Sequence, residues 1–343
     1  MRKLLYELSF DDAGSWLSHQ GQKPFRARQL FEWAYEKNAR TFDEMTNLPA
    51  DLREVLAGSF HVGPLPVLDS QRGPDAHKLL VQMPRGGEVG CVAITMGNTR
   101  TACLSSQVGC DMGCVFCATG QTKCERSLES GEIIAQLITL RATGNPLRPL
   151  SNVVFMGMGE PFGNYNNVVR AIRLITDKMA LGISPSKVTV STAGIVPMIR
   201  KYAQEGLPTE LAVSLNAPND EIRRRLMPGV GKWSVAEIAA VCKEYSAATG
   251  GQPVTFAYVL ISGVNDLLDH AYELARLLRH QPHHVNVIPL NPVGHCEMVA
   301  PDKQRTSAFV HHCRQYGLNA SVRRSKGREI DGACGQLRGR RGG

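Results

Sequence analysis

Three cysteines, Cys110, Cys114 and Cys117, stand within eight residues of one another. Cysteine thiolates bind zinc and iron–sulfur clusters. A closed structural zinc site needs four ligands, and no fourth ligand follows at the spacing of a zinc finger or ribbon. A four-iron cluster held by three cysteines keeps one iron open, and that iron can bind a substrate or cofactor. The spacing therefore favours cluster chemistry, with a zinc knuckle that borrows a distant ligand, or three unrelated buried cysteines, as alternatives.

The residues around these cysteines extend the pattern. The spacing CxxxCxxC, followed by Ala118-Thr119-Gly120, resembles the signature of the radical S-adenosylmethionine (SAM) superfamily. Five further stretches are CLSSQVGC at 103–110, MGMGEP at 156–161, VTVSTAG at 188–194, SLNAP at 214–218 and IDGACGQL at 330–337. In this order they resemble the RlmN/Cfr family of RNA adenine methyltransferases over nearly the whole chain, which weighs against the zinc alternative.

The resemblance implies two cofactors, a [4Fe–4S] cluster on the three cysteines and SAM. The residues that match SAM contacts of the family are Gly159, Glu160, Ser191, Ser214, Leu215, Asn216 and Asn291. From the residues alone, Gly157 and Gly159 allow close approach of the backbone, and Glu160 can accept a hydrogen bond. The structural alternative is a Gly-rich turn between a strand and a helix, with Glu160 at the helix start and the serines as ordinary strand-end residues.

Two more cysteines, Cys103 and Cys334, lie inside the motifs but outside the triplet. Free cysteine is commonly a small buried apolar residue. The resemblance implies more: one SAM methylates Cys334, which then carries the carbon to RNA, and Cys103 resolves the resulting adduct. We assign packing roles to Cys91, Cys242, Cys296 and Cys313, and no role to Cys124.

The implied substrate explains why the methyl group would travel through a cysteine and a radical. A ring carbon of adenine is not nucleophilic enough to attack a sulfonium methyl group directly. A 5′-deoxyadenosyl radical from a second SAM would take hydrogen from the methyl group on Cys334, and the carbon radical would add to adenine. Attack by the Cys103 thiolate would release the product and leave a Cys103–Cys334 disulfide.

One position departs from the family, which has a glutamate proton acceptor thirteen residues before the resolving cysteine. Counting back from Cys103 gives Gly90. Glu88 lies two residues earlier, on the same face of a strand and about 7 Å away. One hypothesis is that Glu88 assists proton removal in place of the family glutamate. The other is that the Cys103 thiolate and water take the proton, with Glu88 as an exposed charge after Gly86-Gly87.

Alternating strand and helix patterns position these motifs. Predicted strands at 101–106, 152–156, 187–191, 210–215, 254–260 and 285–290 alternate with predicted helices at 129–143, 164–178, 196–205, 219–227, 234–248 and 267–280. This alternation implies an α/β fold with parallel strands. Six units are too few for an eight-unit barrel, so we predict an open, partial (β/α)6 barrel of TIM type, which is also the radical SAM fold. The motifs fall at the carboxyl ends of strands, where such folds bind ligands.

The remaining chain is predicted to surround this barrel. Residues 1–62 form a small helical accessory domain, which the resemblance identifies as RNA-binding. Residues 63–98 form a β-hairpin extension with strands at 78–83 and 89–95, after a turn-rich connection at 64–74. The barrel occupies 99–300, and 301–343 hold a helix at 302–316, a strand at 318–323 and a basic tail that carries Cys334.

Basic residues outnumber acidic ones, 39 to 31, for a net charge of +8 and a pI near 9.0. This charge suits a polyanionic partner and also many ordinary basic enzymes. In the N-terminal region Lys23, Arg26, Arg28, Lys37 and Arg40 interleave with Phe25, Phe31, Trp33 and Tyr35, which suits either RNA contact or a solvated helix face over an aromatic core. Near Cys334 the basic residues are Arg323, Arg324, Lys326, Arg328, Arg338, Arg340 and Arg341.

Ten cysteines without a secretory signal predict a reducing compartment, the cytoplasm. No apolar run approaches the ~20 residues of a membrane span, so no membrane partner is expected. The resemblance implies ribosomal RNA as substrate, with transfer RNA as a second one, carbon 2 in preference to carbon 8 of adenine, and an electron donor such as flavodoxin or ferredoxin. The alternatives are a radical SAM enzyme of another specificity and a non-catalytic iron–sulfur RNA-binding protein.

Overall fold

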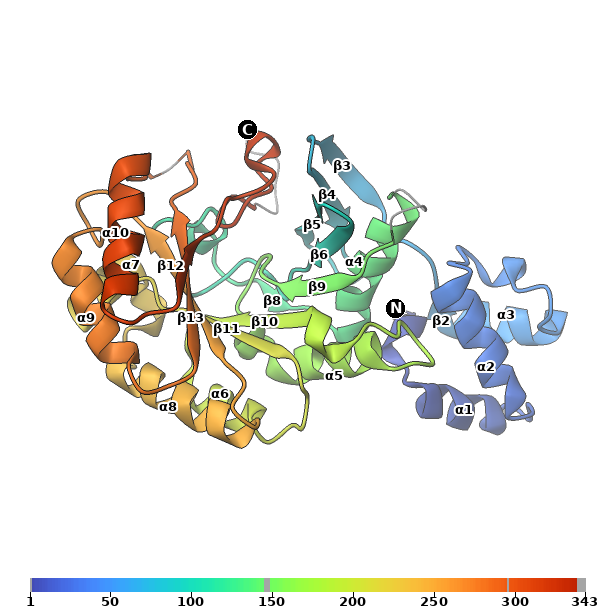
Figure 1. Ribbon diagram of the computed structural model, residues 1–343. Coiled ribbons are helices and arrows are strands. Elements are labelled where there is room, and N and C mark those ends of the chain that lie inside the picture. The colour runs from blue at the N-terminus through green and yellow to red at the C-terminus, as the bar shows by residue number, and fades with distance from the viewer. Residues whose placement is uncertain (1, 145–148, 295, 338–343) are drawn as a thin grey trace.

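In the described residues, seven parallel strands continue into three antiparallel ones to form a single ten-stranded sheet (Figure 1). The computed structural model describes residues 2–144, 149–294 and 296–337. The strand order is β14-β13-β12-β11-β10-β9-β6-β5-β4-β3. The strands are β3 Val67–Arg72, β4 Ala76–Gln82, β5 Glu88–Met96, β6 Thr99–Cys103, β9 Asn152–Phe155, β10 Val188–Thr192, β11 Glu210–Ser214, β12 Val254–Leu260, β13 His283–Pro289 and β14 Ala320–Val322.

Helices connect the parallel strands and cover the outer face of the sheet (Figure 1). They are α4 Ser130–Ala142, α5 Tyr165–Thr176, α6 Val196–Tyr202, α7 Asp220–Leu226, α8 Val235–Ala248, α9 Leu268–Leu278 and α10 Lys303–Gln315. The predicted α/β fold with crossover helices is confirmed. The sheet is open, since within the described chain β14 and β3 each have a neighbour on one side only. No helix in the described ranges is both long enough and apolar enough to cross a bilayer.

The extension before the barrel contains one strand more than the predicted hairpin. Strand β3 lies in the stretch 64–74, which the sequence predicts as a turn-rich connection, and it pairs antiparallel with β4. Its side chains are nearly all exposed, so β3 lacks the apolar alternation that reveals a half-buried strand. At the other side Val92 of β5 pairs with Cys103 of β6, which joins the extension to the barrel sheet.

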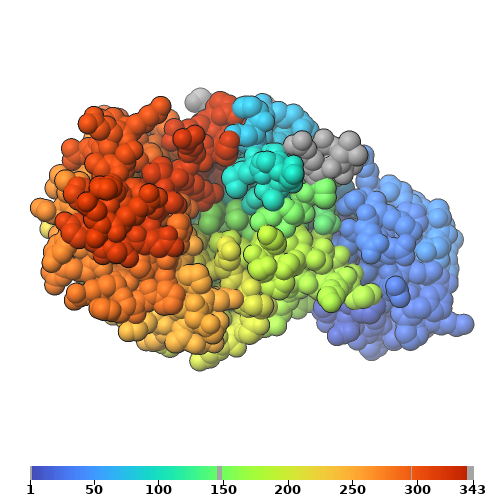
Figure 2. Space-filling view, viewed as in Figure 1, coloured from blue at the N-terminus to red at the C-terminus, as the bar shows by residue number. Residues whose placement is uncertain are grey.

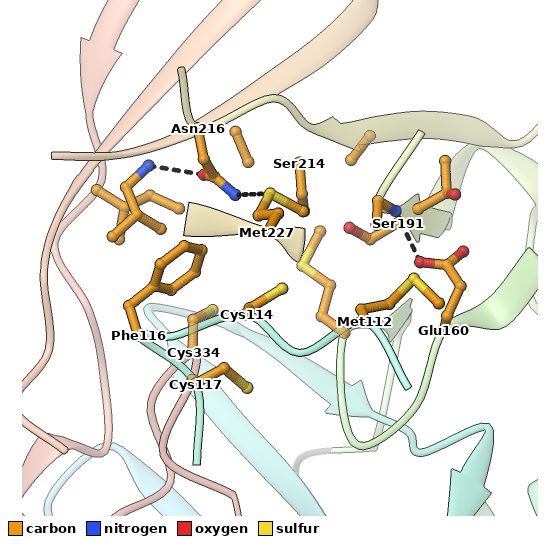
Figure 3. A pocket seen from close by; sticks show the side chains of 18 of the residues that line it. Met112, Cys114, Phe116, Cys117, Glu160, Ser191, Ser214, Asn216, Met227 and Cys334 are labelled. Atoms are coloured by element: carbon orange, nitrogen blue, oxygen red, sulfur yellow. Dashed lines mark hydrogen bonds between the residues drawn. The ribbon is translucent and has the colours of Figure 1, made fainter. Parts of the chain in front are cut away.

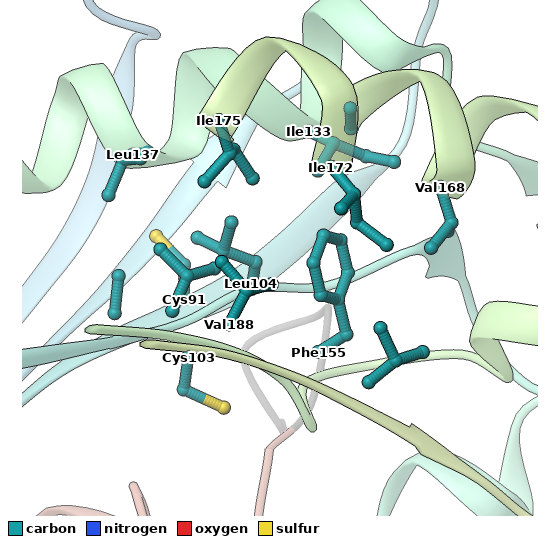
Figure 4. Close-up of a cluster of buried hydrophobic side chains, with 14 of the residues drawn as sticks. Cys91, Cys103, Leu104, Ile133, Leu137, Phe155, Val168, Ile172, Ile175 and Val188 are labelled. Carbon is teal, nitrogen blue, oxygen red and sulfur yellow. The ribbon is translucent and has the colours of Figure 1, made fainter. Parts of the chain in front are cut away.

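An apolar core fills the space between the sheet and helices α4 and α5 (Figure 4). Isoleucine, leucine and valine side chains of both helices pack on Leu104, Phe155 and Val188 of the sheet. Cys91 lies fully buried in this core, while Cys103, on the neighbouring strand, points away from it (Figure 4). Of the other cysteines predicted to serve packing, Cys242 and Cys313 are buried and Cys296 is partly exposed.

The N-terminal residues form a helical module that stands to one side of the barrel (Figures 1 and 2). Its elements are β1 Lys3–Leu4, α1 Phe10–His19, α2 Phe25–Phe31, a turn of π-helix at Glu32–Glu36, α3 Ala50–Ser59 and β2 Phe60–His61. Ser9 and Asp12 form a capping box at the start of α1. The aromatic rings of Phe31 and Tyr35 are buried, whereas Phe25 is 51% exposed.

Candidate active site

A cavity of about 180 Å³ lies inside the barrel, against strands β9 to β13. Ten of the predicted site residues line it: Cys110, Cys114, Cys117, Gly159, Glu160, Ser191, Ser214, Asn216, Asn291 and Cys334. Figure 3 shows Ser191, Ser214 and Asn216 along one wall and the thiols of Cys114, Cys117 and Cys334 along another. The fold therefore brings together motifs that are up to 224 positions apart in the sequence, from Cys110 to Cys334.

The loop that carries the three cysteines is held against the turn after α7. The N–H of Val115 donates to the carbonyl of Leu226 (3.1 Å), and the N–H of Gly229 donates to the carbonyl of Met112 (3.0 Å). Apolar side chains of the loop join a small buried cluster of their own with residues of this turn. The loop is thus fixed by the backbone of its neighbour rather than by the cysteines themselves.

The surroundings of the thiols fit an iron–sulfur cluster. Burial raises the pKa of Cys117, and hydrogen bonds that its sulfur receives from Gly120 and Thr119 act in the opposite direction. Such hydrogen bonds stabilise a bound thiolate. Among the described residues no three His, Cys, Asp or Glu side chains surround one point where a single ion would sit. A four-iron cluster differs from a single ion because each cysteine binds a separate iron.

Glu160 is both a helix cap and part of the cavity wall. It is 3% exposed, and its Oε1 accepts from the N–H of Phe162 (3.0 Å) at the start of a short 3-10 helix, Pro161–Asn164. Its Oε2 accepts from the N–H of Ala193 (2.7 Å) at the end of β10. Burial raises its pKa, and these hydrogen bonds oppose the shift. The helix-start alternative is therefore correct, and the same carboxylate faces the cavity.

The glycines before Glu160 bring the backbone close to another segment of the protein. A Cβ on Gly157 would stand 2.6 Å from Oγ of Ser105, and one on Gly159 would stand 2.7 Å from the backbone N of Gln107. Gly159 also has a φ of +94°, a backbone conformation that residues other than glycine rarely adopt. Both glycines are required by packing against 104–107, in addition to any approach to a cofactor.

Asn216 and Leu215 have different roles at the end of β11. Asn216 accepts through Oδ1 from the N–H of Val259 (2.9 Å) and holds a left-handed backbone with φ of +58°. Leu215 is completely buried and is not among the residues that line the cavity. The cavity lining therefore includes Ser214 and Asn216 on either side of it but not Leu215 itself.

The segment with Cys334 is docked on both sides of the cavity mouth. Asn291 donates to the carbonyl of Cys334 (2.9 Å) and accepts from Nε of Arg328 (2.7 Å). On the other side the cysteine loop holds the segment, because Ala118 N–H donates to Gly335 (2.6 Å) and the Thr119 hydroxyl to Leu337 (2.7 Å). Asn291, expected to contact SAM, therefore also positions Cys334.

A second cavity of about 540 Å³ lies beyond Cys334 and contains Cys103. Met156, Asn286, Arg323 and Cys334 line both cavities. Burial raises the pKa of Cys103 to about 12, and the nearby Cys334 adds to this shift. The basic residues Arg323, Arg324 and Lys326 line the second cavity, and Arg338, Arg340 and Arg341 lie outside the described residues.

Comparisons with known proteins agree with this geometry. The Radical SAM superfamily profile matches residues 104–278, and the profile of the ribosomal RNA large subunit methyltransferase N-terminal domain matches residues 5–62. A protein of Symbiobacterium thermophilum, named "Probable dual-specificity RNA methyltransferase RlmN", is 42% identical over 342 residues, which cover 99% of this chain and 92% of that protein. The chain belongs to the RlmN family.

Further relatives support the assignment. A protein of the same name from Staphylococcus aureus is 40% identical over 339 residues, covering 98% of this chain and 93% of its own length. The crystal structure of a radical SAM methyltransferase from Sphaerobacter thermophilus is similar with a TM-score of 0.95 and 40% identity, covering 98% of this chain and 100% of that one. Membership of the RlmN family implies an iron–sulfur cluster and SAM, and it replaces the zinc alternative.

Of the three predicted catalytic residues, Glu88 alone lies apart from the two cavities. It opens β5 and pairs with Gln82, whereas Cys103 pairs with Val92 of the same strand. Val92 lies four residue steps along the extended strand from Glu88, or about 13 Å. Of the two cavities, as the described residues form them, neither has Glu88 in its lining.

Several residues of the site gave no individual signal in the sequence. Met156 and Asn286 line both cavities, yet neither residue type suggests a role by itself. Thr119 stands in the quoted Ala118-Thr119-Gly120 stretch, but its bond to Leu337 joins segments 218 residues apart. In the sequence Arg328 is one of several basic residues near Cys334. Its hydrogen bond to Asn291 forms only because the fold brings the two segments together.

Proposed function

We propose that this protein methylates a ring carbon of adenine in RNA and that Cys334 carries the carbon. The observation that supports this proposal is the position of Cys334 between two cavities. One cavity contains the cluster cysteines and the residues that match SAM contacts, and the other contains Cys103. A carrier must meet a donor on one side and an acceptor on the other, and Cys334 has this placement.

Each side of Cys334 offers a different environment. When bound, SAM would supply a methyl group for Cys334, and the cluster together with a second SAM would supply the radical chemistry that activates this methyl group. Glu160, Ser191 and Asn216 hold and orient the donor in the first cavity. Arg323, Arg324 and Lys326 hold phosphates at the second cavity, where the target base enters unstacked.

Cys103 completes the reaction. After the carbon has bonded to adenine, the Cys103 sulfur attacks the Cys334 sulfur. Before this attack, the radical adduct would give up the ring proton to a base and one electron to the oxidised cluster. The carbon–sulfur bond then breaks as the Cys103–Cys334 disulfide forms, and the carbon that leaves sulfur takes up a proton to become the methyl group. The disulfide must then be reduced to two thiols before another turnover.

The relatives support RNA as the substrate, because two of them are named dual-specificity RNA methyltransferases and the profile over residues 5–62 is named for a ribosomal RNA methyltransferase. We assign ribosomal RNA and, as the second substrate that the sequence resemblance implies, transfer RNA. Carbon 2 of adenine is the proposed position, in preference to carbon 8. The N-terminal module, residues 1–62, assists RNA binding, and a reduced flavodoxin or ferredoxin supplies electrons in the cytoplasm.

Nucleoside mass spectrometry tests this proposal. The anaerobically reconstituted protein is incubated with SAM, a reductant and either ribosomal or transfer RNA. We expect 2-methyladenosine from both RNAs, a methyl group on the Cys334 peptide, and neither with Cys334→Ala, which should still cleave SAM. Cleavage of SAM without methylated adenosine in either RNA would instead support a radical SAM enzyme of another specificity.

A further inference from the structure

Arg223 on α7 is one of the largest completely buried side chains in the described protein, with 1% exposure. Its guanidinium lies behind the wall of the first cavity. Nη1 donates to the carbonyls of Ser214 (2.9 Å) and Leu215, and Nη2 donates to the carbonyl of Ala193. These carbonyls stand at the ends of β10 and β11. One side chain therefore ties together the two strand ends that carry Ser191 and Ser214.

The positive charge of Arg223 has no carboxylate partner among the ion pairs of the described residues. Its hydrogen bonds go to neutral carbonyls and to the sulfur of Met227, and its buried Nε has no hydrogen-bond partner among the described residues. Burial lowers the pKa of Arg223 to about 10, so the side chain stays cationic at neutral pH. Nearby carboxylates serve other groups: Asp220 accepts from the N–H of Val235 (2.7 Å), and Glu160 accepts from two backbone N–H groups. A buried charge without an opposite charge is unfavourable.

The cysteine loop can supply the negative charge that Arg223 lacks as a partner. Nη1 of Arg223 contacts the sulfur of Met227 (3.6 Å), which lines the first cavity together with Cys114, one of the three cluster cysteines. The residue after Cys114 is also hydrogen-bonded to the helix of Arg223, because the N–H of Val115 donates to the carbonyl of Leu226 (3.1 Å). A cysteine bound to an iron–sulfur cluster is a thiolate. Binding of the cluster therefore places negative charge next to a cation that is already in position and already removed from water.

We propose that Arg223 is a positioning residue with two tasks: it holds the ends of β10 and β11 in place for SAM, and it provides the buried positive charge that offsets the thiolates of the cluster. The proposal goes beyond RNA methylation and rests only on the cluster that family membership implies. A positive charge close to a cluster favours its reduced, more negative state. Arg223 therefore raises the midpoint potential of the cluster.

Three variants separate these tasks. Arg223→Met removes the charge and keeps the bulk, and Arg223→Lys keeps the charge but loses the forked donor geometry. Arg224→Met is the matched control, because Arg224 is exposed on the same helix. The purified proteins are compared with and without reconstituted cluster, by thermal unfolding, by redox titration of the cluster followed by electron paramagnetic resonance, and by SAM binding.

We expect cluster loading to raise Tm less in Arg223→Met than in wild type, and the midpoint potential to be lower. Arg223→Lys should keep the wild-type potential. Both variants should bind SAM about tenfold more weakly, the effect of one lost buried hydrogen bond. Arg224→Met should match wild type throughout. A merely structural role would lower Tm equally with and without cluster and leave the gain on loading unchanged.

Other outcomes overturn the proposal in separable ways. An Arg223→Met protein with wild-type potential and wild-type stabilisation on loading removes the charge assignment. Wild-type SAM affinity in Arg223→Lys removes the positioning assignment. If neither variant folds without cluster, as judged by circular dichroism, Arg223 is a residue of the fold and the proposal is wrong. Failure of the wild-type protein to methylate RNA would contradict the proposed function and leave all these measurements interpretable.

Discussion

Cys91 and Cys103 show how the surroundings of a residue decide its chemistry. They sit on neighbouring strands, and burial raises the pKa of both thiols. Cys91 packs among apolar side chains on the helix side of the sheet, while Cys103 points to the other side and lines a cavity together with Cys334 (Figure 4). Access to a partner, rather than a low pKa, distinguishes the proposed resolving thiol from a packing one.

The pH dependence of product release tests the role of Cys103. Burial raises its pKa to about 12, so nearly all of it is protonated at neutral pH. Below the pKa, the thiolate fraction rises tenfold with each pH unit. We therefore expect the single-turnover rate of RNA release to rise about tenfold per unit from pH 7 to pH 9, as measured by rapid quench and mass spectrometry.

The variant Cys103→Ala provides the control for this profile. It should form the bond between Cys334 and RNA but accumulate the covalent adduct at every pH. A wild-type rate that stays flat between pH 7 and pH 9 would show that formation of the Cys103 thiolate does not limit release.

Glu88→Gln tests the predicted proton acceptor. Because Glu88 starts about 13 Å along β5 from the residue opposite Cys103, we now expect the variant to release product at the wild-type rate. Cys103 and water then remove the proton. Single-turnover kinetics with RNA binding measured separately provide the test. A tenfold slower release with unchanged RNA affinity would restore Glu88 as the base and require β5 to shift on RNA binding.

At the scale of elements, the Cys334 segment depends on two neighbours rather than on its own secondary structure. A 3-10 turn at Arg328–Ile330 precedes it, and its carbonyls accept from the cysteine loop and from Asn291. The loop that binds the cluster therefore also holds the thiol that receives the methyl group. We therefore expect that disorder in the cysteine loop would also disorder the Cys334 segment.

Arg328→Ala tests this docking. Arg328 fixes the amide of Asn291, whose other end holds the carbonyl of Cys334. Loss of this hydrogen bond from a charged donor should cost about 1 kcal/mol, or roughly a fivefold lower rate of Cys334 methylation. Peptide mass spectrometry after incubation with SAM, without RNA, measures the rate. Cluster content should equal that of wild type.

A nearby arginine gives the matched control for that experiment. Arg324 is exposed in the same segment and lines the second cavity, so Arg324→Ala should methylate Cys334 normally and lose only RNA affinity. Equal losses of Cys334 methylation in both variants would mean that general positive charge, and not the contact with Asn291, supports the step.

The sequence predicts elements well where apolar periodicity is strong. The runs that predict strands β9 to β13 are rich in β-branched and apolar residues, which are favoured in the strands of a parallel sheet. Strand β3, Val67–Arg72, was not predicted because its side chains are exposed and show no apolar alternation. Its extended conformation is held by pairing with β4. Likewise Arg223 reads as one of three consecutive arginines, and only the fold shows that it alone is buried. Contacts of this kind depend on neighbours that are distant in sequence.

At the scale of the whole molecule, the N-terminal module and the tail near Cys334 are two separate sources of positive charge. In the module some basic side chains have internal partners. Arg26 donates to Gln29 (2.7 Å) and to the carbonyl of Asn47 (2.8 Å). Lys23 and Arg28 are exposed on the same helical region and are better placed to meet phosphates.

The salt dependence of RNA binding tests the role of the module. Each phosphate contact that is lost should reduce the slope of log affinity against log salt by about 0.7 to 0.9. We expect the double variant Lys23→Gln/Arg28→Gln to lower the slope by up to two such steps and to leave SAM cleavage unchanged. Filter binding or fluorescence anisotropy over a series of salt concentrations measures it.

Two single variants sharpen this experiment. Arg200→Gln removes one positive charge from an exposed ion pair with Glu244 on the outside of the barrel, and it should leave the slope at the wild-type value. Arg26→Gln should mainly lower the stability of the module, because its guanidinium holds Asn47 in place. If the double variant keeps the full slope while Arg324→Ala reduces it, RNA is held by the Cys334 side of the molecule alone. The N-terminal module then serves another purpose.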